Sequence, residues 1–160
     1  MEQLERKTEQ KKTVSPLIAA IFMLLQITWG LPQTLVGLIV FLANIREPHE
    51  LHRCAVHTVW KDRLSGVSLG LFIFTGEDCT RDTKDHEFGH CIQSLILGPM
   101  YLPLIGIPSY LWNRRWRRNL RRNGYAGNYF TFFTERWAEY NKSAVLAADR
   151  KKEQTGENQT

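Results

Sequence analysis

The apolar positions of the chain fall into two long blocks without charge, residues 17–43 and 91–112, which lie between segments dense in charged side chains. The first block is too long for the apolar core of a signal peptide, so it predicts a retained membrane segment. As one helix it would extend about 40 Å, more than the roughly 30 Å of a hydrocarbon core. Pro32 disfavours a straight helix here. The block predicts either one kinked helix or two half-helices in a re-entrant hairpin.

The second block contains Pro99, Pro103 and Pro108, so we expect a broken or re-entrant segment there and no straight transmembrane helix. Trp112 follows at its end, and six of the nine residues 114–122 are arginines. Arginines beside an apolar block are typical of the cytoplasmic side of a membrane and predict contact with membrane lipid. The alternative is a nucleic-acid-binding patch, but no groove-reading element accompanies it, so we expect no nucleic-acid partner.

Two runs rich in β-branched and aromatic residues, 54–60 and 67–74, flank a polar stretch at 61–66. They predict a β-hairpin. Further along the chain, residues 132–148 predict a helix after an aromatic-rich connection. The pattern as a whole predicts an α+β fold that is mainly helical, with one small hairpin.

A helix is predicted directly after the hairpin, beginning near Lys84. Asp82 or Thr83 can cap its N-terminus, because both side chains offer an oxygen to the free backbone N–H groups of a first turn. Gly98, followed by a proline, is a stop signal, so the helix should end at Leu97.

Composition refines this organisation. The chain has 160 residues, of which 43% are hydrophobic and 23% charged, and a net charge of +5. Its mean hydropathy of -0.32 is typical of a soluble protein, but that average conceals the two uncharged blocks. We predict a polar arm at 1–16, one membrane-embedded domain at 17–148 and a disordered polar tail at 149–160. The length and composition exclude a many-span transporter and a disulfide-stapled module, and we expect reduced thiols at Cys54, Cys79 and Cys91.

The strongest chemical signal is the pentapeptide HEFGH at 86–90. On a helix, His86 and His90 lie on one face, so both imidazoles can bind one zinc ion. Glu87 can then reach a water molecule on that metal and act as general base and acid. The alternative is an ordinary helix with two exposed histidines. The strand 67–72, just before the helix, could align an extended peptide substrate.

A catalytic zinc site needs a third protein ligand, and His90 is the last histidine in the chain. Glu135 is the best candidate, and Glu139, one helical turn later, can hydrogen-bond the outer nitrogen of a ligand histidine. Alternatively, the two glutamates form a solvent-facing stripe that pairs with Arg136 or Lys142. The remaining candidate ligands are His57, Asp78 and Cys79.

The HExxH pentapeptide with the downstream helix Glu135-Arg136-Trp137-Ala138-Glu139 resembles zinc metallopeptidases of gluzincin type, in which a glutamate is the third ligand. The longer pattern is similar to a family of small bacterial membrane proteins regarded as metallopeptidases. The resemblance covers residues 65–138 and implies a zincin-like fold, zinc bound by His86, His90 and Glu135, and catalysis by Glu87. An aspartate is the usual residue at the supporting position, so Glu139 departs from that pattern. The matching strings are Ser68-Leu69-Gly70, Gln93-Ser94, Leu97-Gly98-Pro99, Gly106-Ile107-Pro108-Ser109 and Thr134-Glu135-Arg136-Trp137-Ala138.

Membrane topology limits this interpretation. If residues 17–43 and 91–112 were both full spans, the two histidines and Glu135 would lie on opposite sides of the membrane. One zinc ion could not then bind all three side chains. We therefore expect both blocks to return to their starting side, with the zinc site facing the cytoplasm.

Three functions follow as hypotheses. The first is a membrane-bound zinc peptidase that acts on peptide or protein substrates, with Ser68, Leu69 and Gly70 in the substrate-binding strand. The second is a non-enzymatic membrane adaptor or immunity-type module whose metal is structural or absent. The third is a basic protein that binds anionic lipid surfaces. For the peptidase, the group that stabilises the oxyanion is left open among Tyr125, Tyr129 and Tyr140.

Overall fold

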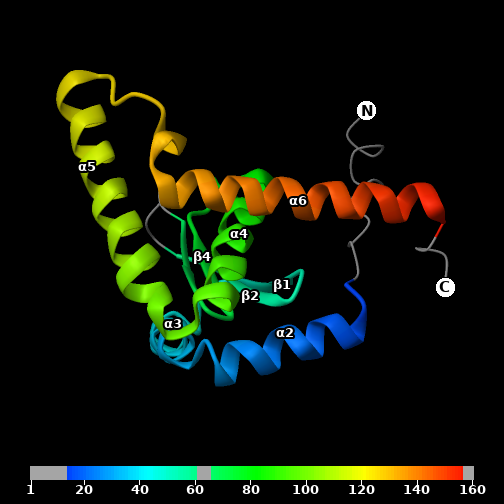
Figure 1. Cartoon of the computed structure of the whole chain (residues 1–160). Coiled ribbons are helices and arrows are strands. Elements are labelled where there is room, and N and C mark those ends of the chain that lie inside the picture. Colours follow the sequence, from blue (N-terminus) through cyan, green and yellow to red (C-terminus); the bar gives the residue numbers. More distant parts are fainter. Residues whose placement is uncertain (1–13, 61–65, 157–160) are drawn as a thin grey trace.

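A computed structural model describes residues 14–60 and 66–156. Figure 1 shows a small sheet and α4 at the centre, between α6 on one side and α2 with α3 on the other. A small mixed sheet with predominant helix confirms the predicted α+β class. The helices are α2 (Pro16–Thr28), α3 (Leu31–Ala43), α4 (Arg81–Leu97), α5 (Ile107–Asn123) and α6 (Phe133–Thr155). The strands are β1 (His49–His52), β2 (Ala55–Val59), β3 (Val67–Leu69) and β4 (Phe72–Thr75).

The sheet has the strand order β1-β2-β4-β3. The predicted hairpin between residues 54–60 and 67–74 is wrong, because β2 and β4 pair in parallel, with His57 opposite Ile73. The antiparallel pairs are β1 with β2 and β3 with β4. A tight turn at Gly70, whose φ is +64°, divides the second apolar run into β3 and β4. The residues predicted as the hairpin loop lie mostly at 61–65, outside the described residues.

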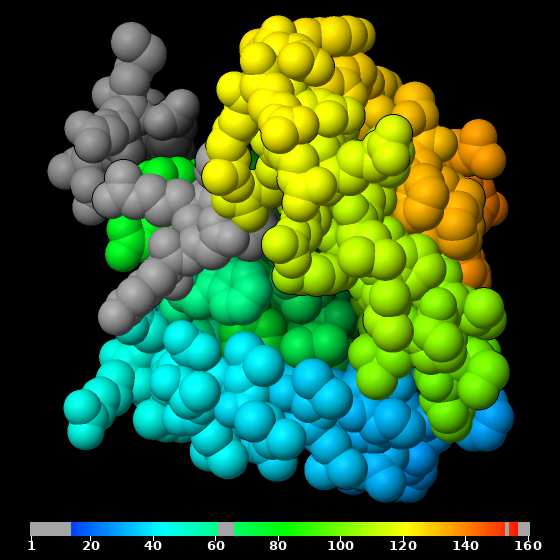
Figure 2. Space-filling view, turned by 90° about the vertical axis from the view of Figure 1, so that its left-hand side faces the viewer, coloured from blue at the N-terminus to red at the C-terminus, as the bar shows by residue number. Residues whose placement is uncertain are grey.

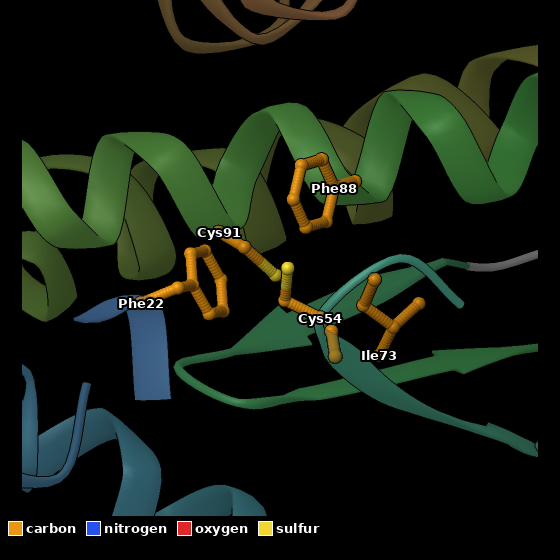
Figure 3. Packing of buried hydrophobic residues seen from close by; sticks show 6 residues of the cluster. Phe22, Cys54, Ile73, Phe88 and Cys91 are labelled. Atoms are coloured by element: carbon orange, nitrogen blue, oxygen red, sulfur yellow. The ribbon is translucent and has the colours of Figure 1, made fainter. Parts of the chain in front are cut away.

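The apolar core lies between the sheet and α4 and includes one side chain from α2 (Figure 3). Phe22 of α2 stacks on Phe88 of α4 with ring centroids 5.5 Å apart. Cys54 and Cys91 are buried in this cluster. Both are free thiols, as is Cys79, which confirms the prediction of unpaired cysteines.

The first apolar block forms a sharply bent pair of helices, α2 and α3, whose axes meet at 96°. Within the described residues, no single helix has the length and apolar character needed to cross a membrane, and this pair passes that test only as a bent unit. Buried amides hold the bend against α4. Gln26 Nε2 donates to the Cys91 carbonyl at 3.0 Å, and Gln33 Nε2 donates to Ser94 Oγ at 2.8 Å.

Helix α4 begins earlier than predicted. Its cap is Thr80, whose hydroxyl accepts a hydrogen bond from the Thr83 backbone N–H at 3.4 Å. The predicted caps, Asp82 and Thr83, therefore lie inside the helix. Its end at Leu97 is as predicted, with Gly98 at φ +53°. The proline-containing stretch that follows is broken into a 3-10 turn, Gly98–Met100, and a π-helical turn, Leu102–Gly106, before α5.

Helix α6 crosses α4 and continues to Thr155, beyond the predicted end at Ala148 (Figure 1). The segment predicted as a disordered tail is thus helical over most of its length. An ion pair explains part of this extension, because Arg53 Nη1 lies 2.9 Å from Asp149 Oδ2. The predicted N-terminal arm lies mostly outside the described residues.

Candidate metal centre

The structure brings the three predicted ligand side chains together between α4 and α6. The Nε2 atoms of His86 and His90 lie 3.2 Å and 3.4 Å from Glu135 Oε2. One ligand atom from each residue falls within 4.8 Å of the others. All three residues are buried, and Glu135 is only 1% exposed. Two imidazoles and one carboxylate are a donor set that can hold a metal ion and leave further positions for water or substrate.

The two helices approach closely enough for this because residue 89 is a glycine. A Cβ atom at Gly89 would collide with the backbone oxygen of Ala138, which is itself fully buried. Two side-chain to backbone hydrogen bonds then bind the helices together. Asn141 Nδ2 donates to the Gly89 carbonyl at 3.2 Å, and Gln93 Nε2 donates to the Thr134 carbonyl at 2.8 Å. The glycine of the pentapeptide therefore sets the distance at which Glu135 reaches the histidines.

The outer nitrogen of each histidine has its own acceptor. His86 Nδ1 lies 3.0 Å from Glu139 Oε2, as the sequence predicts. His90 Nδ1 lies 2.7 Å from Gln93 Oε1. When Nδ1 donates to these oxygens, Nε2 keeps its lone pair and points it at the site. Gln93 was not predicted to contact a ligand, although its position three residues after His90 on the same helix is a usable signal.

The second oxygen of Glu135 is held by hydroxyl groups. Ser109 at the start of α5 donates a hydrogen bond to Glu135 Oε1, and Thr134 Oγ1 lies 3.3 Å from the same atom. This leaves Oε2 free to face both imidazoles. Ser109 is part of the Gly106-Ile107-Pro108-Ser109 segment of the family resemblance, but only the folded chain shows that it contacts Glu135.

Glu87 lies beside the three ligands and is itself buried. Ser68 Oγ on β3 lies 2.6 Å from Glu87 Oε2 and 2.7 Å from the Glu87 carbonyl oxygen, so its single proton is shared between them. Gly66, just before β3, passes so close that an added Cβ would collide with the Glu87 carboxylate. The Tyr101 hydroxyl also holds β3 in place, because it donates a hydrogen bond to the Ser68 carbonyl at 3.0 Å.

Negative charge at the site favours a bound cation. Burial by itself would lower the pKa of His86, but the hydrogen bond to Glu135, the charge of Glu87 and the hydrogen bond to Glu139 outweigh it and raise the pKa to about 9. Burial would likewise raise the pKa of Glu135, yet hydrogen bonds from His86 and His90 hold it well below its ordinary value. In the metal-free protein, the positive charge of protonated His86 therefore offsets part of the negative charge of the carboxylates. A bound metal cation would take over this role at the same place.

A cavity of about 470 Å³ adjoins these side chains, and Glu87, His90 and Glu135 are among the residues that line it. Figure 2 shows the hollow beside α5 on this face of the molecule, with the strands behind it. Ser68 and Leu69 line the cavity, as expected for a substrate-binding strand. Gly70 does not belong to this strand, because β3 ends at Leu69 and Gly70 packs in a turn against Thr34. The structure therefore places Gly70 outside the predicted substrate-binding strand.

Other sequence-based candidates lie elsewhere. His57 is buried in the sheet, where its Nε2 contacts Thr75 Oγ1 at 2.7 Å, and within the described residues it joins no group of potential ligands. Asp78 and Cys79 are likewise outside the cluster. Among the three tyrosines considered for an oxyanion, only Tyr129 lines the cavity.

The alternative of a solvent-facing acidic stripe fails for Glu135, which is buried. It holds in part for Glu139, which contacts both His86 and Lys142, with Lys142 Nζ 2.5 Å from Glu139 Oε1. Lys142 also reaches Asp82 Oδ1 at 2.9 Å, so it ties this carboxylate to the first turn of α4. Glu139 therefore positions His86 while it remains partly accessible to solvent.

Comparison with family models, curated proteins and solved structures found no match for this chain. Its function must therefore be inferred from the arrangement of its own residues. That arrangement is a buried His86, His90 and Glu135 cluster able to hold a metal ion, with Glu87 beside it and a cavity leading to it.

Proposed function

We propose that this protein is a membrane-bound, zinc-dependent metallopeptidase. The observation that carries the proposal is the convergence of His86 Nε2, His90 Nε2 and Glu135 Oε2, with Glu87 in the same cavity. Two imidazoles and a carboxylate match the ligand chemistry of catalytic zinc. The HExxH spacing adds a general base one residue along the same helix.

Each neighbouring residue then has a role in peptide hydrolysis. A bound zinc ion would polarise the scissile carbonyl and lower the pKa of a water molecule towards about 7. Glu87 accepts the proton of that water and later delivers it to the leaving amine. Ser68 orients the Glu87 carboxylate through its hydrogen bond to Oε2. Burial and the charge of Glu135 raise the pKa of Tyr129, so its phenol stays protonated and can donate to the oxyanion.

The substrate class follows from the edge of the sheet. β3 is an outer strand, since it pairs only with β4 in the strand order. It also forms a wall of the cavity beside Glu87. An extended peptide can add to such an edge through main-chain hydrogen bonds, which would place its carbonyl groups next to the metal site.

Membrane attachment belongs to the same proposal. Large apolar side chains on α2 and α3 are exposed, among them Leu17, Leu24, Ile39 and Leu42. An exposed apolar surface of this kind is costly in water and is favourable in lipid. Lipid would cover the α2–α3 pair, and the arginines of α5 favour a site on the cytoplasmic side.

The decisive experiment is the Glu87→Gln variant of the full chain, purified in detergent and assayed with zinc on a mixture of peptides. Among the described residues, the Glu87 side chain bonds to Ser68 and to none of the three metal ligands, so the variant should retain zinc while peptide cleavage falls by at least a hundredfold. Cleavage at the wild-type rate would rule out the proposed mechanism. Zinc far below one ion per chain, unaffected by His86→Ala, would instead favour a non-enzymatic membrane module.

A further inference from the structure

Three arginines of α5 line the same cavity as the candidate metal ligands. They are Arg114, Arg117 and Arg121, and the same cavity is lined by Glu87 and Glu135. Their spacing of three and four residues places them along one face of the helix. The other arginines of the same helix, Arg115, Arg118 and Arg122, do not line the cavity. The arginine cluster of the sequence therefore divides into a row that lines the cavity and a group that does not.

Two arginines of this row form no ion pair within the described part of the chain. They are Arg114 and Arg121, and both are exposed to solvent while they line the cavity. Arg117 already takes part in another interaction, so only Arg114 and Arg121 are assigned to the ligand. A cavity wall with uncompensated guanidinium groups attracts negative charge, and carboxylates match their geometry best when binding is bidentate.

Helix geometry gives the distance between these arginines and the metal ligands. Ser109 anchors the start of α5 by its hydrogen bond to Glu135. At about 1.5 Å per residue, Arg114 lies roughly 8 Å and Arg121 roughly 18 Å further along the helix axis. An extended peptide advances about 3.4 Å per residue. The row is thus about two to five peptide residues away from the position of the scissile bond.

We infer that the cavity selects peptides with a carboxylate group two to five residues from the scissile bond, bound by Arg114 and Arg121. This inference rests on the proposed peptidase function and adds the substrate class. The carboxylate can belong to an acidic side chain or to the C-terminus of the peptide, since both present the same planar anion to a guanidinium group.

A membrane role for the whole arginine cluster is the competing explanation. Anionic headgroups are large and lie in a plane, so they are reached by side chains on an outer surface. Arg114 and Arg121 are exposed, but they also line the cavity that is lined by β3 residues and by His90 and Glu135 of the candidate metal site. This shared cavity favours a peptide ligand for these two residues.

The test uses the full chain in detergent, loaded with zinc, and matched fluorogenic peptides that differ only by Glu or Gln at successive positions. Each peptide is made with a free and with an amidated C-terminus, which separates the two sources of carboxylate. The test variant is Arg114→Gln with Arg121→Gln. The control, Arg118→Gln with Arg122→Gln, makes the same change in net charge on the same helix outside the cavity.

The wild type should prefer the best acidic peptide over its neutral partner by about tenfold in kcat/KM, the effect expected of two partly screened pairs. The test variant should lose this preference and keep its zinc content and its kcat/KM for the neutral peptide. The control should retain the preference. Equal preference in both variants, or none in the wild type, would overturn the inference.

Binding separates this inference from the proposed function. Fluorescence anisotropy with the Glu87→Gln variant measures peptide affinity without turnover. If the wild type cleaves no peptide but Glu87→Gln binds acidic peptides in an Arg114- and Arg121-dependent way, the peptidase proposal fails and the ligand class stands. If both double variants lose binding to vesicles containing anionic lipid and neither loses peptide preference, the row serves the membrane and the inference is wrong.

Discussion

The α4–α6 interface and the α2–α3 pair differ in what they bury and what they expose. The interface buries His86, Glu87, His90 and Glu135, all of them charged or able to carry charge. The α2–α3 pair exposes large apolar side chains, such as Ile39. Burying charge and exposing apolar surface both cost free energy in a water-soluble fold. The proposed function accounts for both departures, with a cation in the first region and lipid in the second.

The two regions are joined through one helix, α4. α4 carries His86 and His90 towards α6, and it carries Ser94 towards the bent pair, where Ser94 Oγ donates to Gln26 Oε1 at 2.9 Å. Gln26 and Gln33 are fully buried in otherwise apolar helices. Their hydrogen bonds fix the position of the apolar pair relative to the candidate metal site. If the pair is embedded, the depth of the site in the membrane is fixed with it.

The largest effect is expected from substitutions on the exposed apolar surface of α2 and α3. Replacement of Leu24 and Ile39, 58% and 69% exposed, by glutamine should weaken vesicle binding by about 4 kcal/mol in total, because each residue loses its transfer into lipid. Flotation with vesicles measures this loss. Zinc content and stability in detergent should not change. Leu51→Gln is the control, since Leu51 is 57% exposed on β1, outside the pair. Equal effects of the control and the double variant would contradict a membrane role for α2–α3.

On the polar side, Gly89→Ala should have the next largest effect. The added Cβ meets backbone at Ala138 and cannot be relieved by a change of rotamer. We expect a loss of about 3 kcal/mol in the free energy of unfolding and loss of bound zinc, because Glu135 moves away with α6. Urea unfolding and metal analysis test this. At Gly106 an added Cβ would lie 3.4 Å from its nearest neighbour, so Gly106→Ala should be mild. Normal zinc binding in Gly89→Ala would show that the close helix approach is not required.

Two buried histidines, His57 and His86, differ in the direction in which their pKa values are shifted, and this predicts a pH dependence of stability. Burial lowers the pKa of His57 to about 4, and the charge of Lys84 adds to this, whereas the pKa of His86 is raised. Unfolded His57 binds its proton near pH 6.5, so its contribution to stability is complete above that pH and is lost as the pH falls towards 4. The full loss corresponds to about 3 kcal/mol at most. Urea unfolding between pH 4 and 7, with a chelator present, should show this slope in the wild type and a smaller one in His57→Asn. The same slope in both proteins would refute the assignment.

The smallest of these effects concerns orientation of a ligand. Gln93→Leu removes the acceptor for His90 Nδ1 and should reduce zinc affinity by about ten- to a hundredfold. Competition with a chromophoric chelator measures this change. The control is Ser94→Ala, one residue further along the same helix. Among the described residues, the Ser94 hydroxyl bonds only to Gln26 and Gln33 of the α2–α3 pair, so this variant should leave zinc affinity unchanged. Similar zinc affinities in the two variants would mean that Gln93 does not orient His90.

The ligand set was predictable because helical periodicity alone places His86 and His90 on one face. Glu135 was reached by elimination and by resemblance, and Glu139 by its spacing of one turn. Ser68 and Ser109 could not be assigned their contacts with carboxylates, since those depend on how β3 and α5 pack against α4 and α6. Contacts between residues distant in sequence are not encoded in any local pattern.

The same limit explains the errors in the fold. The parallel pairing of β2 with β4 brings together strands whose local patterns fit a simple hairpin equally well. The turn at Gly70 was hidden inside an apolar run. Helix α6 continues beyond the residues with apolar periodicity, and part of the reason is the ion pair between Asp149 and Arg53 in the turn between β1 and β2. In each case tertiary contacts decided an outcome that local sequence left open.

The most direct test of the central claim is the zinc content of the full chain, measured by inductively coupled plasma mass spectrometry after purification in detergent. The wild type and Glu87→Gln should each contain one zinc ion per chain. Glu135→Gln should lose most of its zinc, because an amide replaces the carboxylate that faces both imidazoles. Zinc below one ion per chain in the wild type, or an unchanged content in Glu135→Gln, would contradict a metal centre built from these three side chains.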